Sequence, residues 1–140
     1  MCVCSRRGFL AAVTSVIVAL TARAKAAPAE HREFIAAAFK MRDESVRTGD
    51  QAYGAVVVKE GRTIGFGRSR VVSKKDWTAH AEREAIREAQ AQFGRTDLAG
   101  CLLYSSSRPC SACEAAAAQA SIARMYYGSE ATDAGAPRRS

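Results

Sequence analysis

Two short stretches of the chain combine residue types that bind metal ions and move protons. The stretch AHAEREA contains His80, one of the two histidines of the chain, two positions before Glu82. The stretch PCSAC places Cys110 and Cys113 three positions apart. One imidazole and two thiolates are three ligands for a tetrahedral Zn²⁺, and they leave its fourth position open to water. This is the pattern of a catalytic rather than a structural zinc site.

The predicted ligands indicate a hydrolytic reaction in which Glu82 is the acid and base. Zinc lowers the pKa of its water toward neutrality. Since Glu82 lies two positions from His80, its side chain leaves the helix in another direction and is predicted to serve the water rather than the metal. It takes the proton during attack on an amidine-like carbon and returns it toward the departing ammonia. The pattern H-x-E…P-C-x-x-C resembles the signature of zinc nucleobase deaminases.

The same residues have other interpretations. A C-x-x-C pair in an exported protein can be a redox pair, although the tryptophan and glycine pattern of such pairs does not precede it here. His80 can be an isolated surface histidine. Glu82 can be one more charge on a solvated helix face, as Glu84 and Glu88 are expected to be.

Periodicity predicts the elements that position these residues. Gly49 and Gly94 are suited to end two helices, and Glu60-Gly61 is suited to join two short β-rich runs as a hairpin. The order is α-β-β-α-β-α-β, at residues 30–49, two runs within 52–70, 73–94, 101–107, 113–123 and 124–128.

This order predicts an α/β fold with a mixed sheet. The hairpin strands are antiparallel, whereas the last β-α-β unit needs a right-handed crossover and a parallel pair. Helices then cover the faces of the sheet. Two helices start at one edge of the sheet, which would bring His80 to Cys110 and Cys113. The positive end of the helix dipole is expected to favour thiolates there.

From about Phe34 to Gly128 the chain resembles the cytidine and deoxycytidylate deaminase superfamily. The stretches AYGAVVV, IGFGRSRV, TAHAEREAI and LLYSSSRPCSACEAA carry the resemblance. It is strongest with the branch of guanine deaminases, fungal-type cytosine deaminases and bacterial tRNA adenosine deaminases. It implies a three-layer α/β/α fold, a zinc ion at the site described above, and a homodimer or larger assembly.

The resemblance also implies substrate-binding positions. The family holds the base edge with the backbone after the zinc-binding histidine, which is Ala81 here. The branch has a base-binding asparagine where this chain has Ser69, the second predicted substrate-binding residue. Arg108 replaces a usual glutamate or serine, and Trp77 replaces a common proline and offers a stacking face. Relatives continue with another helix and a fifth strand, so the fold is expected to be C-terminally shortened.

Much of the net charge of +7 lies in the N-terminal segment. The first 26 residues hold four of the 21 basic residues and no acid, which leaves 17 basic and 14 acidic residues in the remainder. Residues 1–26 resemble a twin-arginine signal peptide, with SRRGFL, an uncharged run and an A-K-A cleavage pattern. The uncharged run is shorter than the roughly 20 residues of a membrane span. The alternative is a retained apolar helix.

Cleavage after Ala26 would define the mature protein. We expect a periplasmic or exported protein without a stable membrane span, and a cytoplasmic one if the leader is not functional. A zinc deaminase domain is predicted at 27–128 and a mobile tail at 129–140. Three cysteines would remain, which cannot close a disulfide framework, and metal coordination would shield two of them.

The sequence thus predicts a zinc-dependent hydrolytic deaminase of a nucleobase or nucleoside-like small molecule of guanine or cytosine type. One alternative is a nucleic-acid editing deaminase of the tRNA adenosine type, and another is a non-catalytic zinc-stabilised module. Basic residues precede His80 and are either phosphate contacts or a solvated loop; they are Arg68, Arg70, Lys74 and Lys75. Export argues against a nucleic-acid partner, because tRNA is not met outside the cytoplasm.

Overall fold

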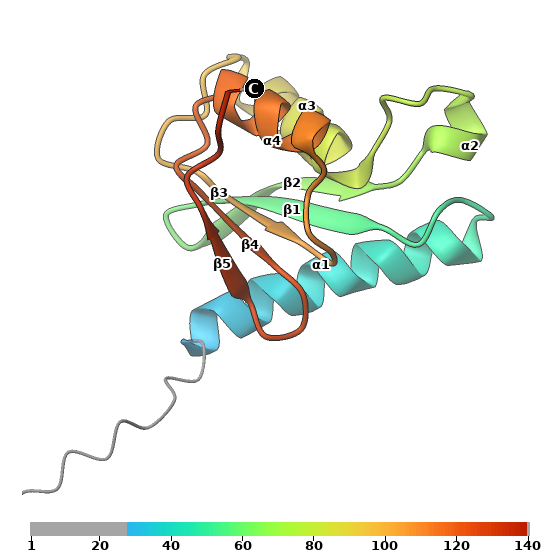
Figure 1. The fold of residues 1–140 in the computed structure, drawn as a ribbon, viewed down its shortest axis with the longest axis horizontal. Helices are drawn as coiled ribbons and strands as arrows, with labels where there is room; N and C mark the ends of the chain where they lie inside the picture. The colour runs from blue at the N-terminus through green and yellow to red at the C-terminus, as the bar shows by residue number, and fades with distance from the viewer. Residues whose placement is uncertain (1–27, 140) are drawn as a thin grey trace, which may run out of the picture.

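The computed structural model describes residues 28–139, which form a three-layer α/β/α sandwich (Figure 1). The predicted leader at 1–26 lies outside these residues. A five-stranded sheet has the order β2-β1-β3-β4-β5. The elements are α1 (Ala29–Arg47), β1 (Gly54–Lys59), β2 (Arg62–Arg68), α2 (Val71–Lys74), α3 (Ala81–Phe93), β3 (Leu102–Ser105), α4 (Ser111–Gln119), β4 (Arg124–Tyr127) and β5 (Thr132–Gly135). No helix between residues 28 and 139 is both long and apolar enough to cross a membrane.

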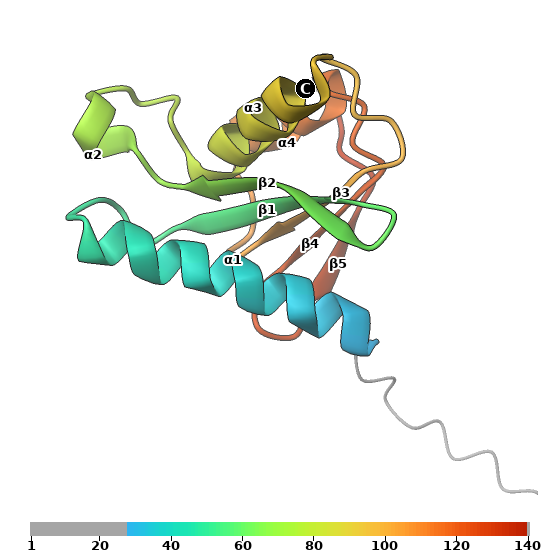
Figure 2. The same cartoon turned by 180° about the vertical axis from the view of Figure 1, so that it is seen from behind.

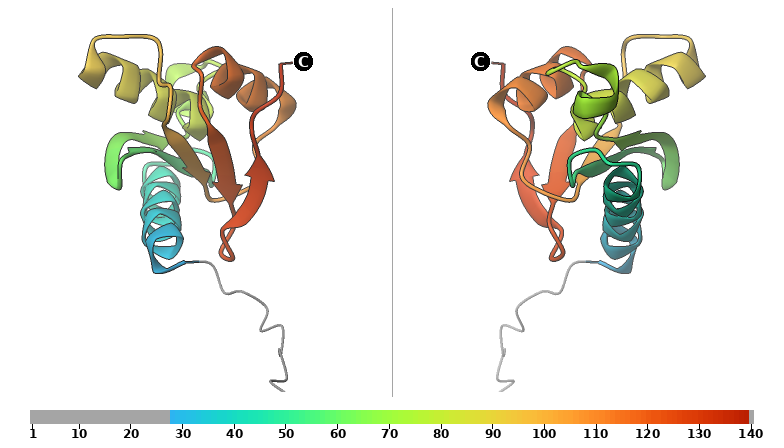
Figure 3. Two further views of the ribbon diagram at one scale, coloured as in Figure 1. Left: turned by 90° about the vertical axis from the view of Figure 1, so that its left-hand side faces the viewer. Right: turned by 90° about the vertical axis from the view of Figure 1, so that its right-hand side faces the viewer.

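The sheet separates two apolar cores. Helix α1 covers one face, whereas α3 and α4 lie on the other (Figures 1 and 3). Side chains alternate between the faces along a strand, so Val56 and Val58 of β1 pack beneath α1 while Ala55 and Val57 pack beneath α3. The α/β fold with three layers is confirmed.

Strand pairing also follows the prediction. Strands β1 and β2 are antiparallel, and the turn between them has positive φ at Glu60 (49°) and Gly61 (74°). Two consecutive left-handed residues are the geometry of a type I′ hairpin. Strands β3 and β4 are parallel, with α4 as the crossover between them, as Figure 2 shows from behind.

Glycine at position 67 allows α3 to lie directly on β2. A Cβ atom there would overlap the carbonyl oxygen of Ala81 and the amide nitrogen of Ala85. Since Ala81 is the first residue of α3, this close approach fixes where the N-terminus of the helix lies on the sheet.

The helix predicted at 73–94 is wrong at residues 75–80, which are not helical. The short α2 ends at Lys74, and Lys75 has a left-handed φ of 51°. The Asp76 carboxylate then accepts hydrogen bonds from the amide and the hydroxyl of Thr78. Such local side-chain bonds compete with helix formation. The chain therefore runs without a helix until α3 begins at Ala81.

Part of the stretch predicted as a mobile tail at 129–140 is a strand. Residues 132–135 form β5, which pairs antiparallel with β4 after a turn. Asp133 accepts hydrogen bonds from Arg124 at 2.8 and 2.9 Å. Further on, the backbone and guanidinium of Arg138 donate to Glu114 on α4. The fifth strand is thus present, and it follows β4 without an intervening helix.

Candidate metal centre

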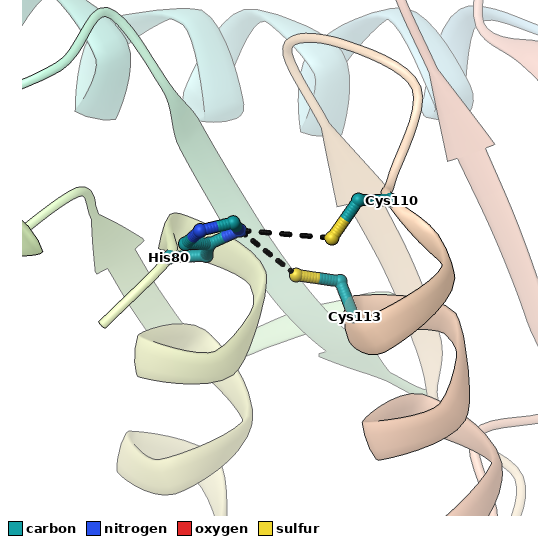
Figure 4. A group of neighbouring side chains, drawn as sticks. All are labelled: His80, Cys110 and Cys113. Atoms are coloured by element: carbon teal, nitrogen blue, oxygen red, sulfur yellow. Dashed lines mark hydrogen bonds between the residues drawn. The ribbon is translucent and has the colours of Figure 1, made fainter. Parts of the chain in front are cut away.

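The N-terminal ends of α3 and α4 bring the three predicted ligands together. His80 is the N-cap residue of α3 and Cys110 is the N-cap residue of α4; both have extended backbones. Cys113 is the third residue of α4 and lies in its first turn. Figure 4 shows the His80 ring and both sulfur atoms pointing toward one another from the two helices.

Their distances fit one metal ion. The Nδ1 atom of His80 lies 3.5 Å from Sγ of Cys113 and 3.7 Å from Sγ of Cys110. All three ligand atoms lie within 4.8 Å of one another. In a tetrahedral site with Zn–S of about 2.3 Å and Zn–N of about 2.05 Å, a nitrogen and a sulfur ligand are about 3.6 Å apart. The residues present therefore fit zinc.

The three residues of the metal centre differ in how deeply they are buried. Cys113 is fully buried, His80 is half-buried and Cys110 is exposed. Burial raises the pKa of the Cys113 thiol well above its usual range, and the nearby Glu82 carboxylate adds to this. The expectation that the helix N-terminus favours a thiolate is therefore outweighed at Cys113, where a thiolate needs a cation beside it.

Glu82 is a buried member of the same centre and not a solvated surface charge. Only 4% of it is exposed. Its Oε1 atom accepts a hydrogen bond from the Ser105 hydroxyl at 2.8 Å, and its Oε2 atom lies 3.5 Å from Sγ of Cys113. One carboxylate oxygen is thus held by the sheet while the other faces a metal ligand.

Sequence reasoning missed Ser105. The sequence offered one indication that Ser105 has a polar partner: it follows Leu103 and Tyr104 in a buried strand, where a hydroxyl needs a hydrogen bond. The partner itself was not visible, since Glu82 comes from α3, 23 residues earlier in the chain.

The two predicted substrate-binding residues lie on either side of the loop before the metal centre. Ala81 is buried and adjoins His80. Ser69 is also buried, and its hydroxyl donates to Oδ1 of Asp50 at 2.9 Å. That hydroxyl therefore already has a partner within the fold, and substrate binding by Ser69 stays a prediction.

Asp50 holds the loop that follows Ser69. Burial opposes ionisation of Asp50, but hydrogen bonds from the amides of Ser73, Gln51 and Val72 and from the Ser69 hydroxyl outweigh it. They hold the pKa of Asp50 well below its usual range. The carboxylate thereby fixes the start of α2 against the end of α1.

The expectation that Glu84 faces solvent is wrong. Its side chain is only 10% exposed and lies between three basic residues, Arg70, Lys74 and Arg87. Burial raises the pKa of Glu84, but hydrogen bonds from Lys74 and Arg87 outweigh this and lower it. Glu84 thus pairs with two members of the basic cluster, and a third member, Arg68, pairs with Glu44.

Comparison with known families identifies the chain. Residues 28–129 match the family described as the cytidine and deoxycytidylate deaminase zinc-binding region. The match covers more than half of the chain and contains the complete metal centre. The chain belongs to this family, and the metal that its centre fits is zinc.

Named relatives fall into two substrate groups. The guanine deaminase of Bacillus subtilis (strain 168) is 39% identical over 105 residues, which are 74% of this chain and 67% of the relative. A tRNA-specific adenosine deaminase of Agrobacterium fabrum is 42% identical over 83 residues, 59% of this chain and 55% of the relative. The chain thus matches about two thirds of one relative and just over half of the other.

Solved structures give the same division. The structure of Bacillus subtilis guanine deaminase has a TM-score of 0.68 and 37% identity, covering 70% of this chain and 63% of its own. A structure from work on A-to-I editing by tRNA:A34 deaminases has a TM-score of 0.67 and 36% identity, covering 69% of this chain and 70% of its own. Both confirm the fold, and together they leave the substrate class unresolved.

Proposed function

We propose that the chain is a zinc-dependent hydrolytic deaminase of a free nucleobase or nucleoside, of guanine or cytosine type. The observation that carries this proposal is the contact of Oε2 of Glu82 with Cys113 inside the metal triad. A buried carboxylate beside a three-ligand zinc site is the arrangement that hydrolysis of an amidine carbon requires. The 39% identity with a guanine deaminase supports the small-molecule substrate.

The proposed roles follow from the positions of the side chains. His80, Cys110 and Cys113 would hold the zinc ion, which supplies a water of lowered pKa when bound. Glu82 would take a proton on Oε2 and deliver it to the departing amine. The exposed side of Cys110 would admit the substrate, and the backbone of Ala81 would hold the edge of its base.

Ammonia release by the zinc-loaded protein tests the proposal. The substrate panel is guanine, cytosine, adenine, cytidine and deoxycytidine, with bound zinc quantified in parallel. We expect about one zinc per chain and ammonia from one member of the panel. Full zinc occupancy without ammonia from any of them would contradict the small-molecule proposal and favour a nucleic-acid substrate or a non-catalytic zinc module.

A nucleic-acid substrate is the second candidate, because relatives with tRNA substrates match at comparable identity. The indole of Trp77 is 82% exposed, and three positions separate it from His80. Exposed aromatic rings near basic residues such as Lys75 stack on unpaired bases. Binding of a tRNA anticodon stem-loop that weakens steeply with salt would favour this candidate, and the absence of binding at low salt would exclude it.

Two further proposals concern the setting of the enzyme. We propose export with cleavage after Ala26, which the twin-arginine pattern and the A-K-A site support. Mass spectrometry of the secreted fraction should then find Ala27 as the N-terminus, and an intact leader would contradict it. We also propose a homodimer, on the resemblance to the family; light scattering should give twice the mass of the mature chain.

A further inference from the structure

Glu82 has an unusual set of partners for a buried carboxylate. No lysine or arginine among residues 28–139 forms an ion pair with it. Its contacts are the Ser105 hydroxyl on Oε1 and the Cys113 thiol on Oε2. Buried charges are usually paired or bind metals. Within residues 28–139, the donor that contacts Oε1 is the neutral Ser105 hydroxyl.

Ser105 has a rigid setting. It is the last residue of β3 and pairs with Ala55 of β1 on one side and Tyr127 of β4 on the other. Its carbonyl oxygen accepts a hydrogen bond from the amide of Gly128 at 3.0 Å. A residue between two paired strands has little freedom, so its side chain starts from a fixed point in the middle of the sheet.

The face of the sheet explains why a hydroxyl at this position is informative. Side-chain alternation puts Ser105 on the same face as Leu103 and Ala55, both members of the apolar core beneath α3 and α4. A hydroxyl buried in such a core costs free energy unless it is hydrogen-bonded. Its hydrogen-bond partner within the described residues is Glu82. For packing alone, alanine or valine would serve at this position as well as serine does.

We propose that Ser105 is a positioning residue for Glu82, an inference that rests on the proposed function. Its hydroxyl binds Oε1 and thereby turns Oε2 toward the metal centre. Without it, the carboxylate would rotate about its side-chain bonds, and Oε2 would leave the position from which it transfers protons. A small misplacement of a catalytic group can reduce the rate by about 100-fold.

Steady-state kinetics of Ser105→Ala, Ser105→Thr and Ser106→Ala in the full zinc-loaded chain test this proposal. Ser106 is the matched control, because its hydroxyl accepts a hydrogen bond from the amide of Gly54 rather than contacting Glu82. We expect Ser105→Ala to lower kcat by about 10- to 100-fold with KM changed by less than about twofold. Ser105→Thr, which keeps the hydroxyl, should recover most of kcat, and Ser106→Ala should retain it. Zinc content should be equal in all four proteins.

The proposal is overturned if Ser105→Ala keeps its kcat, if threonine is no better than alanine, or if zinc is lost with the hydroxyl. A second measurement separates this failure from failure of the proposed function. In a double-mutant cycle of urea unfolding, Ser105→Ala and Glu82→Gln should be non-additive by about threefold or more in the unfolding equilibrium constant. Additive effects would refute the contact. Coupling in a chain that deaminates nothing would refute the proposed function and leave the contact standing.

Discussion

The Nδ1 atom of His80 lies 3.5 Å from Sγ of Cys113, although the two residues are 33 positions apart in the chain. Each stands at the start of a different helix on the same face of the sheet. Helix α3 reaches this place because it rests on the glycines of β2, and α4 reaches it because β3 and β4 are parallel and need a crossover. The metal centre thus forms because the sheet brings the N-termini of α3 and α4 close together.

Loss of a buried ligand should abolish zinc binding. We expect Cys113→Ala to contain less than about a tenth of the zinc of the wild type, because two remaining ligands do not hold a tetrahedral site. Cys101→Ala is the matched control, since Cys101 is a buried free cysteine outside the triad. Elemental analysis after dialysis measures both variants. Equal zinc in Cys113→Ala and the wild type would contradict the assignment of the ligands.

Removal of zinc should also destabilise the wild type. The chelated protein would keep Cys113 as a neutral thiol, because burial raises its pKa. It would lose the stabilisation that a ligand specific to the folded state provides. The melting temperature should fall on chelation and recover on addition of zinc, whereas Cys113→Ala should not respond to either treatment.

Gly67→Ala should displace the metal centre without touching a ligand. The added methyl group would overlap the backbone of α3 at Ala81 and Ala85, and overpacking of this kind costs roughly 1–3 kcal/mol. Zinc affinity should fall together with stability. Gly94→Ala is the control, because its Cβ would meet open space and only its left-handed φ is strained. Gly94→Ala should lower the stability by about 1–2 kcal/mol and leave the zinc affinity unchanged. If Gly94→Ala lost as much zinc affinity as Gly67→Ala, this role for Gly67 would be contradicted.

Asp50 should make the fold sensitive to acid. Its pKa in the folded protein is lower than its usual value of 3.8. Its contribution to stability is therefore complete above about pH 5 and is lost as the pH falls toward the folded-state pKa. Asp50→Asn should be less stable than the wild type at pH 7 by roughly 1–3 kcal/mol and should lose less stability between pH 5 and 3.

Asp43→Asn serves as the control for acid sensitivity. Asp43 is exposed, and its partner within the described part of the chain is its neighbour Arg42, so its removal should change stability by less than about 0.5 kcal/mol. Urea unfolding at pH 7, 5, 4 and 3 measures all three proteins. An Asp50→Asn variant with the same pH dependence as the wild type would show that the amide cluster does not depend on this carboxylate.

Glu84→Gln should loosen the loop before the metal centre. The half-buried carboxylate binds Arg70, Lys74 and Arg87, and the Arg87 guanidinium also donates to Thr78. Leaving these basic groups without their acceptor should cost roughly 1–3 kcal/mol. Hydrogen exchange at residues 75–79 should become faster. Unchanged exchange there would indicate that α2 and Asp50 hold the loop alone.

The three metal-binding residues and the place of Glu82 beside them were predictable from the sequence because they belong to two local patterns. His80 and Glu82 share one helix start, and Cys110 and Cys113 share another, so spacing alone placed them. Strand order was predictable for a related reason, since a β-α-β unit permits few connections.

Contacts between distant segments were not predictable in the same way. Ser105 meets Glu82 only because β3 lies beneath α3. Glu84 looked like a solvated charge because two of its basic partners, Arg70 and Lys74, come from the segment around α2 rather than from α3. The strand at 132–135 has no alternation of apolar and polar residues, and its pairing with β4 depends on a turn and the Arg124–Asp133 contact.

The joint role of Glu82 and the zinc triad is tested by comparing the wild type with Glu82→Gln at equal, measured zinc content. Ammonia release is followed with the full panel of guanine, cytosine, adenine, cytidine and deoxycytidine as substrates. We expect the wild type to release ammonia from one of them. The variant should bind the same amount of zinc but lose the activity by at least about 100-fold, because glutamine cannot carry the proton. Equal activity in both proteins, or no activity in either across the full panel, would contradict the claim that Glu82 and the zinc triad form a nucleobase deaminase.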